Sequence, residues 1–196
     1  MSSKKQSKTM KDLIRIGVFG ALLIVVAFLL AFTIGFLPPV LVVLPAIIGL
    51  FAGMIFTVML EKVDLAGGIL IPSILLGLCL FTMAPYGMMC FCLIGGGILG
   101  EILYHILGKH TTKGLMAGSS SALLGLALGE YIPFIWMQEA YHALMANDDP
   151  AMLEIAQWCM DTVNVPIMIV LCLVTVLVTS LGVVWGKKII AKRLAK

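Results

Sequence analysis

A single glutamate inside a long apolar stretch is the residue best placed to do chemistry. Glu130 lies about eight residues inside the outer end of an apolar run over 114–138. If that run spans a membrane, a carboxylate at this depth is costly unless it is paired, protonated or in contact with water. Helical spacing places it on one face with Ser119, Phe134, Met137 and Tyr141. This face predicts a partly aromatic ligand cavity that opens outward. The alternative is a neutral, hydrogen-bonded glutamic acid that ties helices together.

A second group of polar and aromatic residues gathers near the same predicted ends of the apolar runs. Its members are Thr82, Tyr86, Trp136, Gln138, Trp158 and Asn164. Trp and Tyr favour the headgroup level of a membrane, which explains most of them singly as interfacial anchors. Taken together they also predict the wall of a pocket, to which Met83, Met88, Met89 and Met137 add apolar contacts, although methionine is often filler. The candidate ligand-binding residues are Glu130, Phe134, Met137, Tyr86, Thr82, Gln138, Trp158 and Asn164.

No catalytic or metal-binding pattern accompanies these residues. Glu101 and His105 are four apart and are expected to pair on one helix face in a structural or interfacial role. The other histidines, His110 and His142, fall in two further connections, so neither a metal site nor a bound cofactor is predicted. The sequence also lacks a Walker A loop and the His-Glu-x-x-His and Gly-x-Ser-x-Gly motifs. We therefore expect a protein that is not itself an enzyme.

The elements that position Glu130 are membrane-spanning helices. Of 196 residues, 61% are hydrophobic and only 12% are charged, which excludes a water-soluble monomer. A membrane crossing needs about 20 apolar residues. The apolar runs predict six helices in a single all-α membrane domain over 1–196, with spans near 13–36, 40–60, 66–83, 86–107, 114–138 and 164–186. The third is short for a full crossing, and Pro72 lies in its first turns.

The charges predict which way these spans face. All 13 Lys and Arg residues fall in the two tails or in the connections that hold Lys62, Lys109 and Lys113. The charged residues of the long connection over 139–163 are all acidic, namely Glu139, Asp148, Asp149, Glu154 and Asp161. By the positive-inside rule, both termini are expected to be cytoplasmic and the acidic loop to lie outside. The net charge of +3 is too small to suggest nucleic acid as a partner.

Small residues form faces on three of the predicted helices. On the first they are Gly17, Gly20, Ala21, Ala27, Ala31 and Gly35, within an arc of about 120°. Membrane helices associate by close backbone approach through such residues. This stripe predicts either a contact within the chain or a docking face for another subunit. On the fifth span Gly118, Ala122, Gly125 and Gly129 favour internal packing, and Gly95, Gly96, Gly97 and Gly100 thin the fourth in the same way.

Several segments resemble a known family in their order and spacing. They are Lys11-Asp12-Leu13-Ile14-Arg15-Ile16-Gly17, Leu44-Pro45-Ala46-Ile47-Ile48-Gly49-Leu50-Phe51-Ala52-Gly53, Gly95 to Glu101, and Gly186-Lys187-Lys188. With six spans and cytoplasmic tails, the chain resembles the S components of energy-coupling factor (ECF) transporters, and more closely their Trep_Strep (MptD-like) branch. One segment departs from that branch, which often has a Gly-His-Gly-Trp type sequence where Met83-Ala84-Pro85-Tyr86-Gly87 follows Thr82 here.

This resemblance implies a function and partners. It implies an S component in a bacterial cell membrane that captures a small molecule (vitamin-like, tetrapyrrole or iron-linked) at the outer face. A transmembrane T subunit and two cytoplasmic ATPases supply the power in such transporters. The resemblance places T-subunit docking on the first helix, at Gly17, Gly20 and Ala21, and the ligand pocket between the first outer loop and the outer halves of spans four to six. The alternative is a standalone secondary carrier or membrane scaffold protein.

Overall fold

The described part of the chain is helical throughout. The structure is a computed structural model that describes residues 2–145 and 150–194, and it contains no strand within these ranges. Its helices are α1 (Ser2–Ile34), α2 (Pro38–Leu60), α3 (Leu70–Cys79), α4 (Met88–Ile106), α5 (Thr112–Trp136), α6 (Gln138–Met145), α7 (Pro150–Thr162) and α8 (Val165–Leu194), with a 3₁₀ turn η1 (Pro85–Gly87) before α4. Asp148, Asp149 and Lys196 lie outside the described residues.

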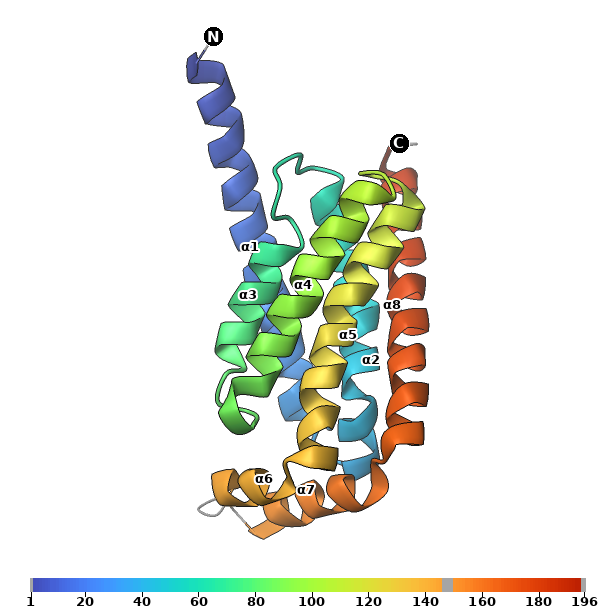
Figure 1. Ribbon diagram of the computed structural model, residues 1–196. Coiled ribbons are helices and arrows are strands. Elements are labelled where there is room, and N and C mark those ends of the chain that lie inside the picture. Colours follow the sequence, from blue (N-terminus) through green and yellow to red (C-terminus); the bar gives the residue numbers. More distant parts are fainter. Residues whose placement is uncertain (1, 146–149, 195–196) are drawn as a thin grey trace.

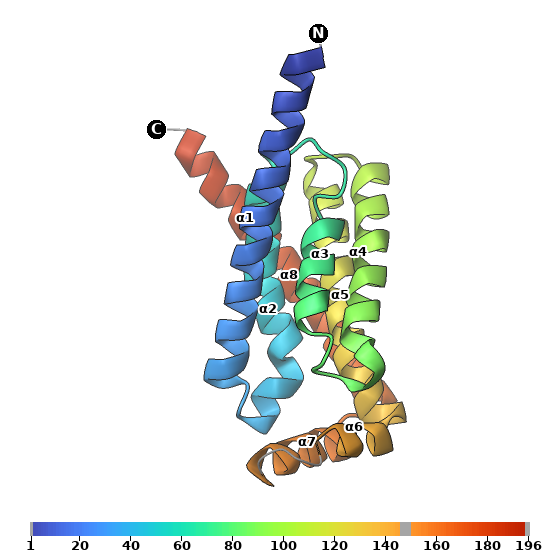
Figure 2. The same cartoon turned by 90° about the vertical axis from the view of Figure 1, so that its left-hand side faces the viewer.

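The long helices form an upright bundle that is closed at one end by two short crosswise helices. Helices α1, α2, α4, α5 and α8 run alongside one another, and α6 and α7 lie across one end (Figures 1 and 2). Both ends of the described chain lie at the opposite end of the bundle (Figure 1). We call these the α6–α7 end and the terminal end. In the described ranges, five helices are long and apolar enough to cross a membrane.

Two predicted segments differ from the structure. The third helix covers only Leu70–Cys79, and its 10 residues extend about 15 Å, half of a membrane core. Gly67, at a φ of +95°, turns the chain before α3, and turns and η1 fill the stretch from Leu80 to Gly87. The acidic stretch over 139–163, predicted as a loop, is largely the helices α6 and α7. It folds as helix because apolar residues recur at helical spacing, and Ala156, Cys159 and Met160 are buried against the bundle.

Glycines set the closest helix contacts. Helices α4 and α5 meet so closely that a Cβ on Gly96 would stand 2.6 Å from the Ser121 carbonyl oxygen. A Cβ on Gly125 or Gly100 would likewise collide with backbone of the facing helix. Helices α2 and α8 meet in the same manner, through Gly53 and Gly182. The predicted internal packing of the fifth span is therefore confirmed, and these contacts hold α5 rigidly in the bundle.

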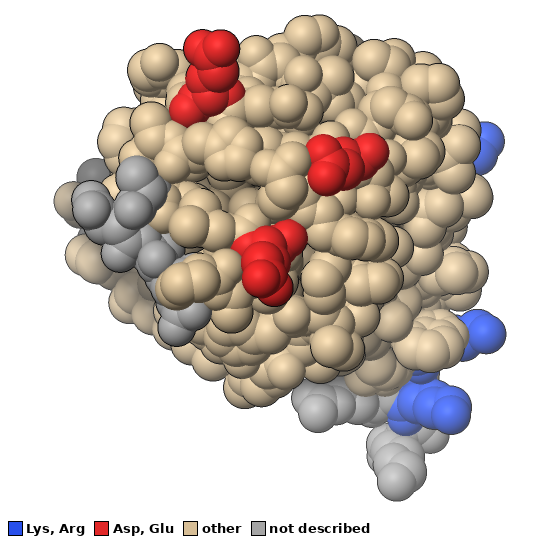
Figure 3. Space-filling view, turned by 90° about the horizontal axis from the view of Figure 1, so that it is seen from below, with Lys and Arg blue, Asp and Glu red and all other residues tan. Residues whose placement is uncertain are grey.

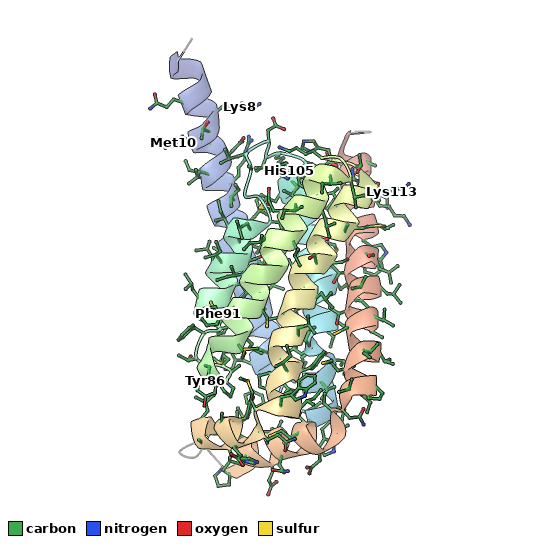
Figure 4. The ribbon with its side chains drawn as sticks, viewed as in Figure 1. Lys8, Met10, Tyr86, Phe91, His105 and Lys113 are labelled. Carbon is green, nitrogen blue, oxygen red and sulfur yellow. The ribbon has the colours of Figure 1, made fainter. Side chains whose placement is uncertain are left out.

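Charged residues join the connections at the terminal end. Lys8 pairs with Asp64 at 2.8 Å, and Arg15 donates to the Lys62 carbonyl oxygen at 2.6 Å. The hydrogen bond and charge of Lys8 lower the pKa of Asp64 from its usual value. Lys187 on α8 pairs with Glu61 at the end of α2. The basic residues thus fasten α1 and α8 to the α2–α3 connection, at the end where Figure 4 shows Lys8, His105 and Lys113.

Glu101 on α4 caps the short helix α3. Its carboxylate accepts hydrogen bonds from the backbone N–H groups of Gly67 at 2.8 Å, Ile69 at 2.8 Å and Leu70 at 3.3 Å. These donors have no partner within α3, because the first N–H groups of a helix have no preceding carbonyl. His105 lies beside Glu101, with Nδ1 3.6 Å from a carboxylate oxygen. The structure therefore supports the structural role expected for this pair.

Replacing Glu101 by alanine is expected to destabilise the chain. Loss of the carboxylate leaves three backbone donors without an acceptor, which costs about 1–3 kcal/mol of unfolding free energy. Unfolding in mixed micelles with increasing SDS measures this difference. His105→Ala is the matched control, since it leaves the Glu101 carboxylate in place and removes a partly exposed imidazole whose contact with that carboxylate contributes about 1 kcal/mol or less. Equal stability of the two variants would show that Glu101 does not hold α3.

Candidate ligand-binding cavity

A cavity of about 190 Å³ lies at the α6–α7 end of the bundle. Its wall comes from α1, α2, α4, α5, α6 and α7 and from two connections. The lining residues are Ala27, Phe28, Ala31, Phe32, Gly35, Phe36, Leu41, Leu44, Ile48, Leu80, Met83, Met89, Leu126, Glu130, Phe134, Tyr141, Met145, Met152, Ile155 and Ala156. Such a concave, mostly apolar space with few polar groups is the common form of a small-molecule site.

Glu130 is the one charged residue in this wall, as far as the structure describes it. Helix α5 carries it on the same side as Leu126 and Phe134, one turn before and after, and the side chain is only 5% exposed. Its Oε1 atom is buried and has no hydrogen-bond partner among the described residues. The interpretation of Glu130 as a hydrogen-bonded tie between helices therefore finds no support at this atom. A buried carboxyl oxygen without a partner is a costly feature that a bound donor or cation relieves.

Aromatic rings and thioethers form the surface around Glu130. Phe134 packs against Tyr141 of α6, with ring centroids 5.2 Å apart and planes inclined by 55°. On α1, Phe28 and Phe32 stack along the helix at 5.8 Å. Four methionines join them, from the α3–α4 connection, α4, α6 and α7: Met83, Met89, Met145 and Met152. Aromatic faces and thioethers are polarisable, so this wall suits a flat or rounded apolar ligand.

Two of the eight residues predicted to bind a ligand line the cavity, Glu130 and Phe134. Tyr141, predicted on the same face, joins them, and so do Met83 and Met89. The other six predicted residues, Met137, Tyr86, Thr82, Gln138, Trp158 and Asn164, are not among the lining residues. The structure therefore brings together Glu130, Phe134 and Tyr141 of the predicted face, but not Ser119 or Met137, and it leaves all six residues of the polar and aromatic group outside the lining.

The six outlying residues have other positions. Tyr86 is 75% exposed and points away from the bundle (Figure 4), and Thr82 and Trp158 are also exposed. Gln138 donates a hydrogen bond to the Phe134 carbonyl oxygen at 2.8 Å, which closes the end of α5. Asn164 accepts from the Ile167 N–H at 3.1 Å and so caps the start of α8. Met137 is the C-cap residue that follows the last residue of α5. Polar residues here serve helix ends and the surface, because each helix terminus has free backbone groups.

Helices α1 and α2 form a part of the wall that the sequence does not indicate. Ala27, Ala31 and Gly35 belong to the small-residue stripe of α1, but they line the cavity. Their small size leaves the space that larger side chains would fill. The first outer connection contributes Gly35 and Phe36, as the resemblance implies, and α4 and α5 contribute too. Helix α8, the sixth predicted span, is not among the lining elements, and its place is taken by α1, α2, α6 and α7.

The other residues of the α1 stripe, Gly17, Gly20 and Ala21, do not share one environment. Gly20 is buried against α3, where an added Cβ would meet Leu75 at 3.2 Å. Gly17 and Ala21 are exposed, and an added Cβ on Gly17 would meet nothing within 4 Å. The predicted docking residue Gly20 thus makes a contact within the chain, whereas Gly17 and Ala21 stay on a free face.

Comparison with known proteins adds one finding. Residues 10–196 match the model of a family described as a hypothetical bacterial integral membrane protein (Trep_Strep). No curated protein and no solved structure matches the chain significantly. Among the described residues, no group of three or more His, Cys, Asp or Glu side chains is arranged to hold a metal ion. The cavity around Glu130 is accordingly the site on which a functional argument can rest.

Proposed function

The chain belongs to the Trep_Strep family of bacterial integral membrane proteins, and from this premise we propose that it is the substrate-binding S component of an ECF-type importer. It captures a small molecule at the outer face of the membrane and passes it on through an ATP-driven complex. The observation that carries this proposal is the cavity at one end of the bundle, with the unpartnered Oε1 atom of Glu130 in its wall. A capture protein needs such a site, and a membrane scaffold does not.

The proposed orientation places the terminal end in the cytoplasm. Lys62 follows α2, Lys109 follows α4 and Lys113 lies in the first turn of α5, so these basic residues join those of α1 and α8 at the terminal end. Three exposed acids, Glu139, Glu154 and Asp161, lie on α6 and α7, at the opposite end of the bundle, which Figure 3 shows with acidic side chains on its face. The positive-inside rule then puts the cavity on the outer side. In this arrangement the chain crosses six times, with α3 as a short third crossing.

The proposed partners are a transmembrane T subunit and two cytoplasmic ATPases. Import against a gradient needs an energy source, and the sequence has no nucleotide-binding loop of its own. Helix α1 packs mainly against α2 and α3, and its other side exposes Val18 and Val25 around Gly17 and Ala21. This lateral face, which needs no rearrangement of the bundle to become accessible, supports a partner helix as its neighbour.

Affinity purification from native membranes tests the proposal. The tagged full chain is expected to bring down a transmembrane subunit and two ATPases in fixed proportion, and uptake by the reconstituted complex is expected to require ATP. A matched purification of an unrelated six-span protein controls for unspecific recovery. Uptake driven by an ion gradient in liposomes that contain this chain alone would overturn the proposal in favour of a standalone carrier.

A further inference from the structure

The charge of the ligand follows from what the cavity offers. Among its described lining residues there is no Lys, Arg or His, and Glu130 is the one acid. An anionic ligand would bring a negative charge beside Glu130 into an apolar wall that has no cation to meet it, which is strongly unfavourable. A neutral apolar ligand would fill the space and leave Oε1 of Glu130 without a partner. A cation or a neutral hydrogen-bond donor satisfies both requirements, and the aromatic wall and the charge of the outer surface favour the cation.

The wall around Glu130 also suits a positive charge. Phe28, Phe134 and Tyr141 present aromatic rings to the cavity. The face of an aromatic ring attracts cations, and more strongly where water is excluded. Met83 and Met89 add polarisable sulfur that tolerates ligands of varied shape. The cavity therefore provides one carboxyl group that can pair with a cation and an apolar surface for the rest of the molecule.

The protein surface outside the cavity is acidic, as Glu130 is. Glu139, Glu154 and Asp161 are exposed on α6 and α7, and the sequence from 114 to 186 contains no Lys or Arg. Figure 3, which looks onto this end, shows acidic side chains on the face and basic ones only at its margin. A surface of one sign raises the local concentration of oppositely charged ligands. This acidity is independent of Glu130 and favours the same class of ligand.

We propose that the cavity binds a singly charged organic cation, with a protonated or quaternary nitrogen on an apolar body about the size of one aromatic ring system. The nitrogen pairs with Glu130, and the body lies against the phenyl rings and methionines. This assignment rests on the proposed function of the chain as a capture protein, and it names the chemistry of the ligand. It disfavours ligands with several carboxylates, among them carboxylated tetrapyrroles.

Three probes of similar size and different charge test the assignment on the purified full chain in lipid nanodiscs. They are benzyltrimethylammonium (positive), N,N-dimethylbenzamide (neutral) and phenylacetate (negative), each titrated by calorimetry. We expect benzyltrimethylammonium to bind roughly tenfold or more tightly than the other two, because only it pairs with Glu130. Preference for the neutral or the negative probe, or binding of none of them, would overturn the assignment.

Variants locate the effect at Glu130. Glu130→Gln keeps the shape of the side chain and is expected to weaken binding of benzyltrimethylammonium roughly tenfold or more while changing binding of the amide by less than about twofold. Glu130→Asp keeps the charge and is expected to retain part of the selectivity. Glu154→Gln removes the same charge from the outer surface and is expected to change affinity by less than about twofold in physiological salt, which screens exposed charges. Thermal unfolding confirms that each variant is folded.

Failure of this inference can be told apart from failure of the proposed function. Unchanged selectivity in Glu130→Gln contradicts the cation assignment, whereas the complex with the T subunit and ATPases is tested without any probe. A chain that assembles with its partners and prefers phenylacetate is a capture protein for another ligand class. A chain that prefers benzyltrimethylammonium but has no partners binds the proposed ligand in another function.

Discussion

Replacing both Gly17 and Ala21 by leucine is expected to abolish co-purification of the chain with the proposed T subunit and ATPases. Both residues are exposed on α1, and the space beside Gly17 is empty within 4 Å, so the isolated chain accommodates the added side chains. A partner helix that packs on these residues depends on close approach of the two backbones. Two leucines keep the partner helix away from α1, and the contact between the two subunits is therefore lost.

The control for this variant adds bulk at an exposed position of α1 that points away from Gly17. Leu22→Phe enlarges a residue that is 45% exposed and lies about 140° around α1 from Gly17, so assembly is expected to persist. Gly20→Leu is expected to behave differently again, since the new side chain meets Leu75 and Pro72 and lowers the stability of the chain itself. Thermal unfolding separates this case from a lost partner contact. Undiminished recovery of the partners with Gly17→Leu plus Ala21→Leu would rule out this face as the docking surface.

Gly96→Ala is expected to loosen the contact between α4 and α5, although the change adds a single methyl group. The new Cβ would stand 2.6 Å from the Ser121 carbonyl oxygen and 2.9 Å from the Gly125 Cα. Both are backbone atoms, which cannot rotate away as a side chain can. The helices must separate, at a cost of about 1–3 kcal/mol in unfolding free energy. The hydrogen bond from Ser121 Oγ to the Gly96 carbonyl oxygen, now 3.1 Å long, weakens as well.

The neighbouring glycine provides a matched control for Gly96→Ala. Gly95 lies one residue earlier on α4, and an added Cβ there meets nothing within 4 Å. Gly95→Ala is therefore expected to shift the stability by about 0.5 kcal/mol or less. SDS-titrated unfolding, followed by circular dichroism, measures both variants under the same conditions. If the two alanines have equal effects, the α4–α5 contact is not the tight one that the structure indicates.

The amino-acid sequence predicts well that the chain is a membrane protein and where its long helices lie. Apolar runs identify five helices that are long enough to cross, and the positions of Pro and Gly indicate where they break. Spacing at 3.6 residues per turn places Glu130 and Phe134 on one face of α5, and both line the cavity, whereas Tyr141, expected on that face, reaches the cavity from α6. These predictions succeed because they depend on the local period of the helix and on the cost of polar groups in lipid, both of which are properties of neighbouring residues.

The polar group near the ends of the spans shows where such reasoning fails. Gln138 and Asn164 have the right types for a ligand site, yet their side chains bond to backbone at the ends of α5 and α8. The same residue types serve both purposes, and only their orientation in space distinguishes them. The small-residue stripe on α1 shows the same limit. Its residues lie on one helical face, but some contact α3, some line the cavity and some lie on the free surface.

The sequence by itself determined that this chain is a helical membrane protein, which charges belong at its terminal end, and which acid lies at membrane depth. The tertiary structure alone decided that α1, α2, α6 and α7 close a cavity around that acid, and that α8 stays out of it. It also decided that Glu101 caps α3 and that Gly20 packs inside while Gly17 does not. The physical reason is that hydrophobicity and helix periodicity depend on the residues of one segment. A cavity, in contrast, exists only where several segments that are distant in sequence fail to fill the space between them.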